Sequence, residues 1–122
     1  MAERGGSYQD LVVWQQAMDL VSDIYLTTRA WPREETFGLT SQVRRAAVSI
    51  PANIVEGFGR ENRGSYLQFL RIAQGSLKEL ETQLLIADRV GVAETGSVAL
   101  LLERAESVGK LLRLLLRKLA ST

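Results

Sequence analysis

Residues 38–59, GLTSQVRRAAVSIPANIVEGFG, decide the fold, because their apolar residues recur with the period of an α-helix. At about 100° per residue, one line of side chains forms the stripe that faces a bundle core. This core stripe contains Leu39, Val43, Ala46, Ile50, Ile54 and Gly57. A second apolar line beside it contains Val48, Pro51, Val55 and Phe58. Together the lines cover roughly 220° of the circumference, whereas a surface helix needs little more than about 100°, so the second line is a candidate oligomer interface.

Pro51 interrupts this helix near its centre. An internal proline removes one backbone hydrogen bond and clashes with the preceding turn, at a cost of about 3 kcal/mol, so the sequence predicts a kink near residues 48–51. The remaining circumference carries small or polar side chains that suit hydrogen bonds between helices. These are Ser41, Gln42, Arg45, Ser49, Ala52, Asn53 and Glu56.

Composition limits both the size and the chemistry of the protein. The chain has 122 residues, of which 46% are apolar, and this is enough for one domain with a real core. We expect that domain at residues 10–120, after a flexible segment at residues 1–9. The absence of cysteine and histidine excludes disulfides, thiolate nucleophiles, Cys/His zinc sites and histidine acid–base chemistry. No metal, cofactor or small-molecule substrate is therefore expected.

The sequence also carries no sign of export or membrane insertion. It has no apolar stretch near its N-terminus and no run of about 18 apolar residues. The expectation is a cytoplasmic protein that does not contact a membrane.

The first helix is predicted to begin near Asp10, whose side chain can accept hydrogen bonds from the first turn. It should end before Trp31, because the residue preceding a proline is pushed out of the helical region. Residues 32–37 then form a short connector with at most one turn of its own. The predicted core line of this helix contains Leu11, Trp14, Met18, Val21 and Tyr25.

The third helix is predicted at residues 65–90, after a polar turn, with Gly91 at its C-terminal cap. Its predicted core line contains Tyr66, Phe69, Leu70, Ala73, Leu77, Leu80, Leu84 and Ala87. Gly75 lies inside this helix, where glycine costs about 1 kcal/mol against alanine. The close approach of another backbone is the expected compensation.

The fourth helix is predicted to begin near residues 95–97 and to follow a heptad seam. The seam contains Leu101, Ala105, Val108, Leu112, Leu115 and Leu119. Three further leucines, Leu100, Leu111 and Leu114, fall outside it. They join the candidate oligomer interface, because surplus apolar surface commonly marks an interface.

Charge alternates in sign along the four predicted helical segments. Net charge is negative in residues 1–37 and 76–96, and positive in residues 38–75 and 97–122. This pattern favours an all-α, antiparallel up-down-up-down four-helix bundle, in which every neighbouring pair is opposite in charge.

The same basic residues have a second interpretation, as surfaces for phosphate contacts. The candidates are Arg44, Arg45, Arg60, Arg63, Lys110, Arg113, Arg117 and Lys118. An overall charge of only +1 makes this signal weak, since nucleic-acid-binding domains are usually more basic.

Carboxylates provide the remaining chemical possibility. Glu56, Glu79 and Glu81 lie nearest to small or apolar residues, but Glu79 and Glu81 are two apart and point to different faces of a helix. Di-iron bundles use Glu-x-x-His motifs, and histidine is absent. We therefore expect no enzymatic activity.

Three strings carry a family resemblance: DLVVWQQAMDLV at residues 10–21, GLTSQVRRAAVSIPANIVEGFGR at 38–60 and FLRIAQGSLKELETQL at 69–84. They resemble bacterial four-helix-bundle proteins named after open reading frames in intervening sequences of 23S ribosomal RNA genes. The residues that match the motif of this family are Trp14, Arg45, Ser49, Pro51, Asn53, Glu56, Gly57, Gly75, Ser76, Glu79 and Glu81.

The resemblance implies one four-helix bundle that assembles as a ring-shaped homopentamer without established enzymatic activity. The implied fold is also similar to the accessory variability determinant of diversity-generating retroelements, a basic pentamer that binds nucleic acid; this chain differs in being nearly neutral. The expected function is RNA or DNA binding by a homo-oligomer, for which the resemblance implies a pentamer. The alternative is a protein–protein interaction scaffold with no nucleic-acid role.

Overall fold

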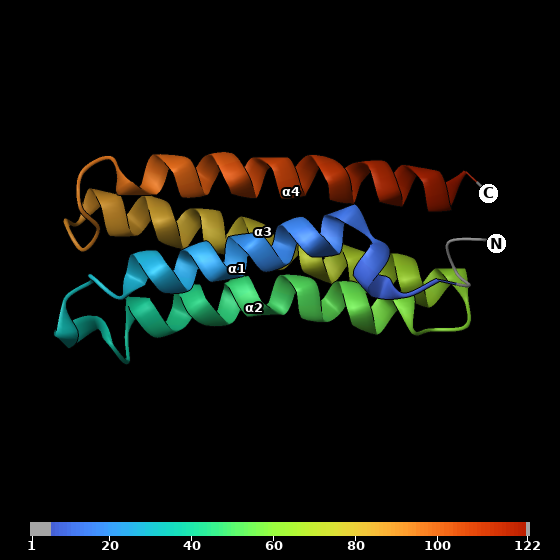
Figure 1. Cartoon of the computed structure of the whole chain (residues 1–122), viewed down its shortest axis with the longest axis horizontal. Helices are drawn as coiled ribbons and strands as arrows, with labels where there is room; N and C mark the ends of the chain where they lie inside the picture. Colours follow the sequence, from blue (N-terminus) through green and yellow to red (C-terminus); the bar gives the residue numbers. More distant parts are fainter. Residues whose placement is uncertain (1–5, 122) are drawn as a thin grey trace.

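The computed structural model describes residues 6–121 and contains four α-helices and no strand within that range. The helices are α1 (Val12–Thr28), α2 (Leu39–Phe58), α3 (Arg63–Arg89) and α4 (Ser97–Ala120). Two short 3-10 turns, Tyr8–Asp10 and Arg33–Glu35, precede α1 and α2. Figure 1 shows the four long helices side by side, with consecutive helices running in alternating directions. The predicted all-α four-helix bundle is confirmed.

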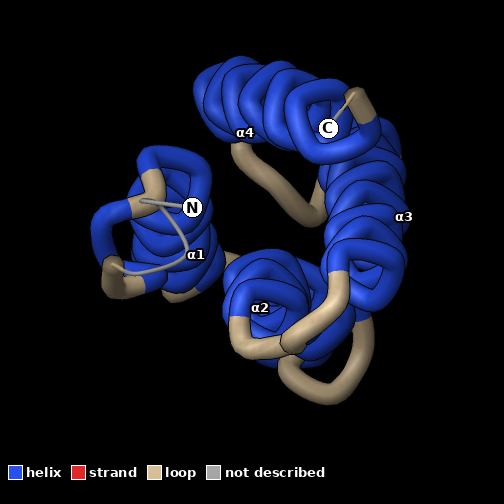
Figure 2. Tube along the Cα trace, turned by 90° about the vertical axis from the view of Figure 1, so that its right-hand side faces the viewer, coloured by secondary structure: helices blue, strands red, loops and turns tan. Residues whose placement is uncertain are grey.

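The four helices surround one core. Figure 2 shows α2 and α4 on opposite sides of the bundle axis, with α1 and α3 between them on either side. Each helix therefore packs against two neighbours, and α2 packs mainly on α3 and α1. This arrangement decides which surface residues from different helices can act together.

Helix α2 passes through Pro51 without interruption, and the predicted kink stays a prediction. Its core stripe is buried from Val43 to Gly57, and Leu39 packs against it at the edge. In the second apolar line, Pro51 was expected at an oligomer interface. It is instead buried within its own chain and cannot contact a partner. Phe58 is also engaged, since its ring meets the Tyr66 ring edge-on at 6.2 Å between centroids.

A glycine does bring two helices together, but it is Gly57. A Cβ on Gly57 would lie 2.9 Å from Phe69 Cβ and 3.2 Å from the Tyr66 carbonyl oxygen. The close approach predicted at Gly75 is wrong within this chain, because a Cβ there would meet no described atom within 4 Å. Gly75 lies on the exposed side of α3, whereas Gly57 lies in the contact between α2 and α3.

The predicted core line of α1 is wrong by one position. The buried residues of this helix are Val13, Ala17, Leu20, Ile24 and Thr28. Met18 and Tyr25 stay 40% and 39% exposed, and Leu11, Trp14 and Val21 pack only on the margin of the core. Both lines have helical spacing, so the pattern alone did not separate them. The bundle buries the line with the small Ala17 and Thr28 and leaves the bulkier one outside.

The start of α1 also differs from prediction. Asp10 does not cap the helix; it ends the 3-10 turn, and Leu11 occupies the cap position without a side-chain hydrogen bond. The predicted flexible segment at residues 1–9 lies partly outside the described residues. Within the described part, Ser7 caps the turn and the Tyr8 ring meets the Trp14 ring edge-on at 5.3 Å.

Helices α3 and α4 follow the predicted pattern closely. Asn62 caps α3 by accepting a hydrogen bond from the Ser65 backbone at 2.7 Å, and Gly91, with φ of 79°, follows its end. The predicted core lines of both helices are buried, with Phe69 and Leu115 only partly so. Leu111 is partly buried and packs against the core, whereas Leu100 and Leu114, the other two interface candidates of α4, are 54% and 58% exposed. No helix among the described residues is long and apolar enough to span a membrane.

Candidate nucleic-acid interface

The eight predicted phosphate-binding residues do not form one surface. They lie on α2 (Arg44, Arg45), at the turn into α3 (Arg60, Arg63) and on α4 (Lys110, Arg113, Arg117, Lys118). Because α2 and α4 are diagonal in the bundle (Figure 2), the two cations of α2 and the four of α4 lie on helices that are not neighbours.

Arg44 makes its contacts with residues of its own chain. Its guanidinium lies 4.6 Å from the centroid of the Tyr25 ring, and its Nε donates a hydrogen bond to Thr28 Oγ1 at 2.9 Å. These contacts join α2 to α1 and use the charge that phosphate binding would need. The neighbouring Arg45 is exposed and donates to Ser41 Oγ at 3.3 Å on its own helix.

Arg60 is also engaged within the chain. Its Nη2 donates to Glu56 Oε2 at 3.0 Å, and its guanidinium lies 4.8 Å from the centroid of the Phe69 ring. Glu56 is exposed and pairs with Arg60, so it does not form the hydrogen bond between helices that the sequence suggested. Arg63 begins α3 and is exposed.

The face of α4 that carries Lys110, Arg113 and Arg117 is the most available basic surface. The three residues are exposed, and their spacing of three and four places them on one side of the helix. Among the described residues, none of the three lies within 4.0 Å of a carboxylate. Their charges therefore remain open to a ligand.

Two cations that the sequence reasoning missed lie beside this face. Arg71 and Lys78 of α3 line a groove of about 410 Å³ together with Arg113 of α4. Lys78 donates to Glu81 Oε1 at 3.1 Å. The available signal was the spacing of Arg71, Gly75 and Lys78, which puts all three on one side of α3.

Several family-motif residues meet in a polar contact between α2 and α3. The hydroxyls of Ser49 and Ser76 lie 2.8 Å apart, and either oxygen can donate. Asn53 Nδ2 donates to the Ser49 carbonyl at 2.8 Å and to its hydroxyl at 3.0 Å. Of the small or polar residues predicted to form hydrogen bonds between helices, Ser49 does so, and this bond joins α2 to α3.

A shallow groove of about 270 Å³ continues this contact toward Arg45, Glu79 and Gln83. Gln83 is 9% exposed, and its Oε1 has no hydrogen-bond partner among the described residues. Arg45 and Glu79 do not form an ion pair there. The family-motif residues between α2 and α3 thus form a hydrogen-bonded contact and, beside it, a small open polar surface.

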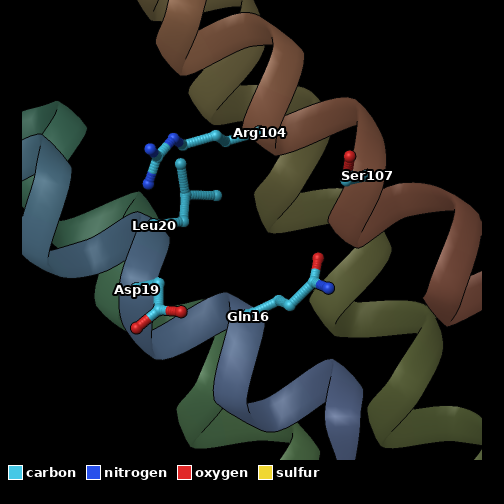
Figure 3. A pocket seen from close by; sticks show the side chains of 5 residues that line it. All are labelled: Gln16, Asp19, Leu20, Arg104 and Ser107. Carbon is cyan, nitrogen blue, oxygen red and sulfur yellow. The ribbon is translucent and has the colours of Figure 1, made fainter.

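A cleft of about 240 Å³ separates α1 from α4 and is lined by polar residues of both helices. Figure 3 shows Gln16 and Asp19 on one side, and Arg104 and Ser107 on the other. Arg104 also donates to Asp23 of α1. No group of three or more acidic side chains among the described residues is placed to hold a metal ion.

Comparison with known proteins places this bundle in a defined class. Its fold is similar to the crystal structure of a protein of unknown function from the S23 ribosomal protein family of Bacteroides thetaiotaomicron VPI-5482, with a TM-score of 0.79. The alignment covers 87% of this chain and 96% of that chain at 22% identity. No curated protein matches the sequence.

Residues 9–114 match the family described as 23S rRNA-intervening sequence protein. This match spans most of the chain, and the chain therefore belongs to that family. The resemblance drawn from the sequence strings is confirmed at the level of the family.

Proposed function

We propose that this protein is a non-enzymatic, homo-oligomeric four-helix bundle that binds RNA or DNA through phosphate contacts. The observation that carries the proposal is the basic face of α4. Lys110, Arg113 and Arg117 are exposed there and form no ion pair within the described residues. Cations that are not paired within the chain can release phosphate-bound counterions when they bind nucleic acid.

The test is the salt dependence of binding. Fluorescence anisotropy with labelled RNA and DNA should show affinity that falls steeply between two salt concentrations. Replacing Lys110, Arg113 and Arg117 together by glutamine should weaken binding to every sequence alike and make the salt slope shallower by up to about three. The matched control is Arg29→Gln, which removes an exposed charge from the end of α1. Unchanged affinity and slope in the triple variant would contradict the proposal.

Assembly is the second part of the proposal, and the family resemblance suggests a pentamer. Its support is exposed apolar surface: Val48 is 42% exposed, Leu100 54% and Leu114 58%. Because Val48 is exposed in the single chain, Val48→Asp should leave the bundle folded while placing an unpaired charge in an interface, which costs several kcal/mol. Light scattering should then report a lower mass than for the wild type. A wild-type mass would exclude Val48 from the interface.

The alternative function is a protein–protein interaction scaffold. The observation that favours it is exposed apolar surface on α1 and on the connector that follows this helix. Met18, Tyr25, Leu26 and Phe37 are exposed there, Phe37 at 96%. If the protein is a scaffold, it should not bind nucleic acid, or any binding should be unaltered in the triple glutamine variant. The same anisotropy titration therefore separates the two functions.

A further inference from the structure

The groove between α3 and α4 combines open space with positive charge. Its volume is about 410 Å³. Its lining includes Arg71, Gln74, Gly75 and Lys78 of α3 and Gly109 and Arg113 of α4. The groove adjoins the basic face of α4, with Arg113 common to both.

Two glycines line the groove, and packing within the chain explains only one of them. A Cβ on Gly109 would lie 3.2 Å from Leu77 Cδ2, so glycine there lets α4 approach α3. A Cβ on Gly75 would meet nothing within 4 Å. Glycine inside a helix is less favourable than alanine, and no contact in the described chain compensates at Gly75. The bare backbone at Gly75 therefore suits the close approach of something from outside.

Cations surround this bare backbone. The Arg113 Nη1 lies 3.7 Å from the position of a Cβ on Gly109, so its guanidinium extends over the groove. Neither Arg71 nor Arg113 forms an ion pair with a described residue. Lys78 pairs with Glu81, but its side chain is 72% exposed, and such a pair is weak. The groove is thus suited to an anion.

The length of the groove fits a short stretch of nucleic-acid backbone. Arg71 and Lys78 are two turns apart, about 10 Å along the axis of α3 at about 1.5 Å per residue. About two or three phosphates of one strand fit along this length. A space of about 410 Å³ holds part of one strand, whereas a duplex would reach only its rim.

Gln74 brings an amide group to the groove. Its side chain is half-buried at the groove, and its amide has no hydrogen-bond partner among the described residues. A glutamine amide both donates and accepts hydrogen bonds. The ribose 2′-hydroxyl does the same and is absent from DNA.

We propose that the α3–α4 groove binds the backbone of single-stranded RNA. A phosphate passes over Gly75 between Arg71 and Arg113, and the Gln74 amide hydrogen-bonds a neighbouring 2′-hydroxyl. This inference rests on the proposed nucleic-acid binding and specifies the strand and its path.

The experiment compares the wild type with three groove variants and two control variants. The probes are labelled single-stranded RNA, single-stranded DNA of the same sequence and duplex DNA. Gly75→Leu should melt at or above the wild-type temperature, because leucine favours a helix and the space over Gly75 is open. Its affinity for single-stranded RNA should nevertheless fall at least about tenfold, because the side chain occupies the groove. Ala52→Leu, which adds the same side chain to an exposed position of α2, should bind as the wild type does.

Two charge and amide variants complete the test. Arg71→Gln should weaken RNA binding by about threefold to tenfold and reduce the salt slope by about one, whereas Arg29→Gln should not. Gln74→Leu should lower the affinity for RNA to that for DNA and leave DNA binding unchanged.

The outcomes separate this inference from the function on which it rests. If the Lys110, Arg113 and Arg117 triple variant loses binding while Gly75→Leu and Arg71→Gln bind as the wild type, the groove is excluded and the proposed function stands. Equal wild-type affinity for RNA and DNA would overturn the assignment to RNA. A wild type that binds no nucleic acid would overturn both. A change in oligomeric mass on Gly75→Leu would identify the groove as a contact between copies and refute it as an RNA site.

Discussion

The pair of helices α2 and α3 and the pair α1 and α4 are held together in different ways. Between α2 and α3 the backbone itself is close, since a Cβ on Gly57 would lie 2.9 Å from Phe69 Cβ. The hydroxyls of Ser49 and Ser76 meet at 2.8 Å in the same contact. Both pairs have a surface groove, but α1 and α4 are joined beside theirs by the side-chain ion pair of Arg104 and Asp23.

This difference shows which pair of helices has the more precisely fixed packing geometry. A glycine contact and a part-buried hydrogen bond each require one geometry, so they fix how α2 lies on α3. The ion pair between Arg104 and Asp23 joins α4 to α1 through side chains that are 48% and 28% exposed, and such pairs tolerate many geometries. We therefore expect the contact between α1 and α4 to be the weakest between neighbouring helices.

The largest effect is expected at Gly57. Gly57→Ala should lower the free energy of unfolding by about 1–3 kcal/mol, because the methyl group would overlap Phe69 and the Tyr66 backbone. Urea unfolding followed by circular dichroism measures this change. Gly75→Ala is the matched control and should raise stability by about 1 kcal/mol, since it improves helix propensity in open space. Equal changes at both glycines would show that the α2–α3 contact is looser than described.

The hydroxyl pair should contribute less. Ser49→Ala and Ser76→Ala should each cost about 1 kcal/mol, because each leaves a part-buried hydroxyl without its partner. A double-mutant cycle should give a coupling of at least about 0.5 kcal/mol. Strict additivity would mean that the two hydroxyls do not depend on each other. Ser22→Ala is a suitable control, because its hydroxyl is exposed on α1 and bonds only to its own helix.

The smallest effect is expected in the looser pair of helices. Asp23→Asn should lower stability by at most about 1 kcal/mol at low salt, and the loss should shrink as salt screens the partly exposed charges. Thermal melting at two ionic strengths measures this. A loss above about 2 kcal/mol that persists in high salt would contradict the weak contact between α1 and α4, because it would indicate a buried ion pair.

The same contrast explains how much of the fold was predictable from sequence. The core lines of α2, α3 and α4 are broad and unambiguous, so helical periodicity located them. Helix α1 carries two adjacent apolar lines with equivalent spacing, and periodicity gives no preference between them. Packing decided for the line with Ala17 and Thr28, and that choice depends on the shape of the other three helices.

The candidate site was predictable only in part. Spacing alone grouped Lys110, Arg113 and Arg117, because all three lie on one helix. It did not reveal that the Arg44 guanidinium contacts Tyr25 and Thr28, since those contacts depend on how α1 lies on α2. It also missed Arg71, whose relation to Arg113 exists only once α3 and α4 are side by side.

The positions of the two tryptophans give the protein an optical probe of its weakest contact. Trp14 lies on α1, and Trp31 follows that helix and is 7% exposed. Since the chain has only these two tryptophans, all indole emission comes from α1 and the connector after it. Detachment of α1 exposes both rings to water and shifts this emission to longer wavelength. Circular dichroism, in contrast, follows all four helices. Unfolding of α1 ahead of the other three would therefore appear as a fluorescence transition that precedes the loss of helical signal.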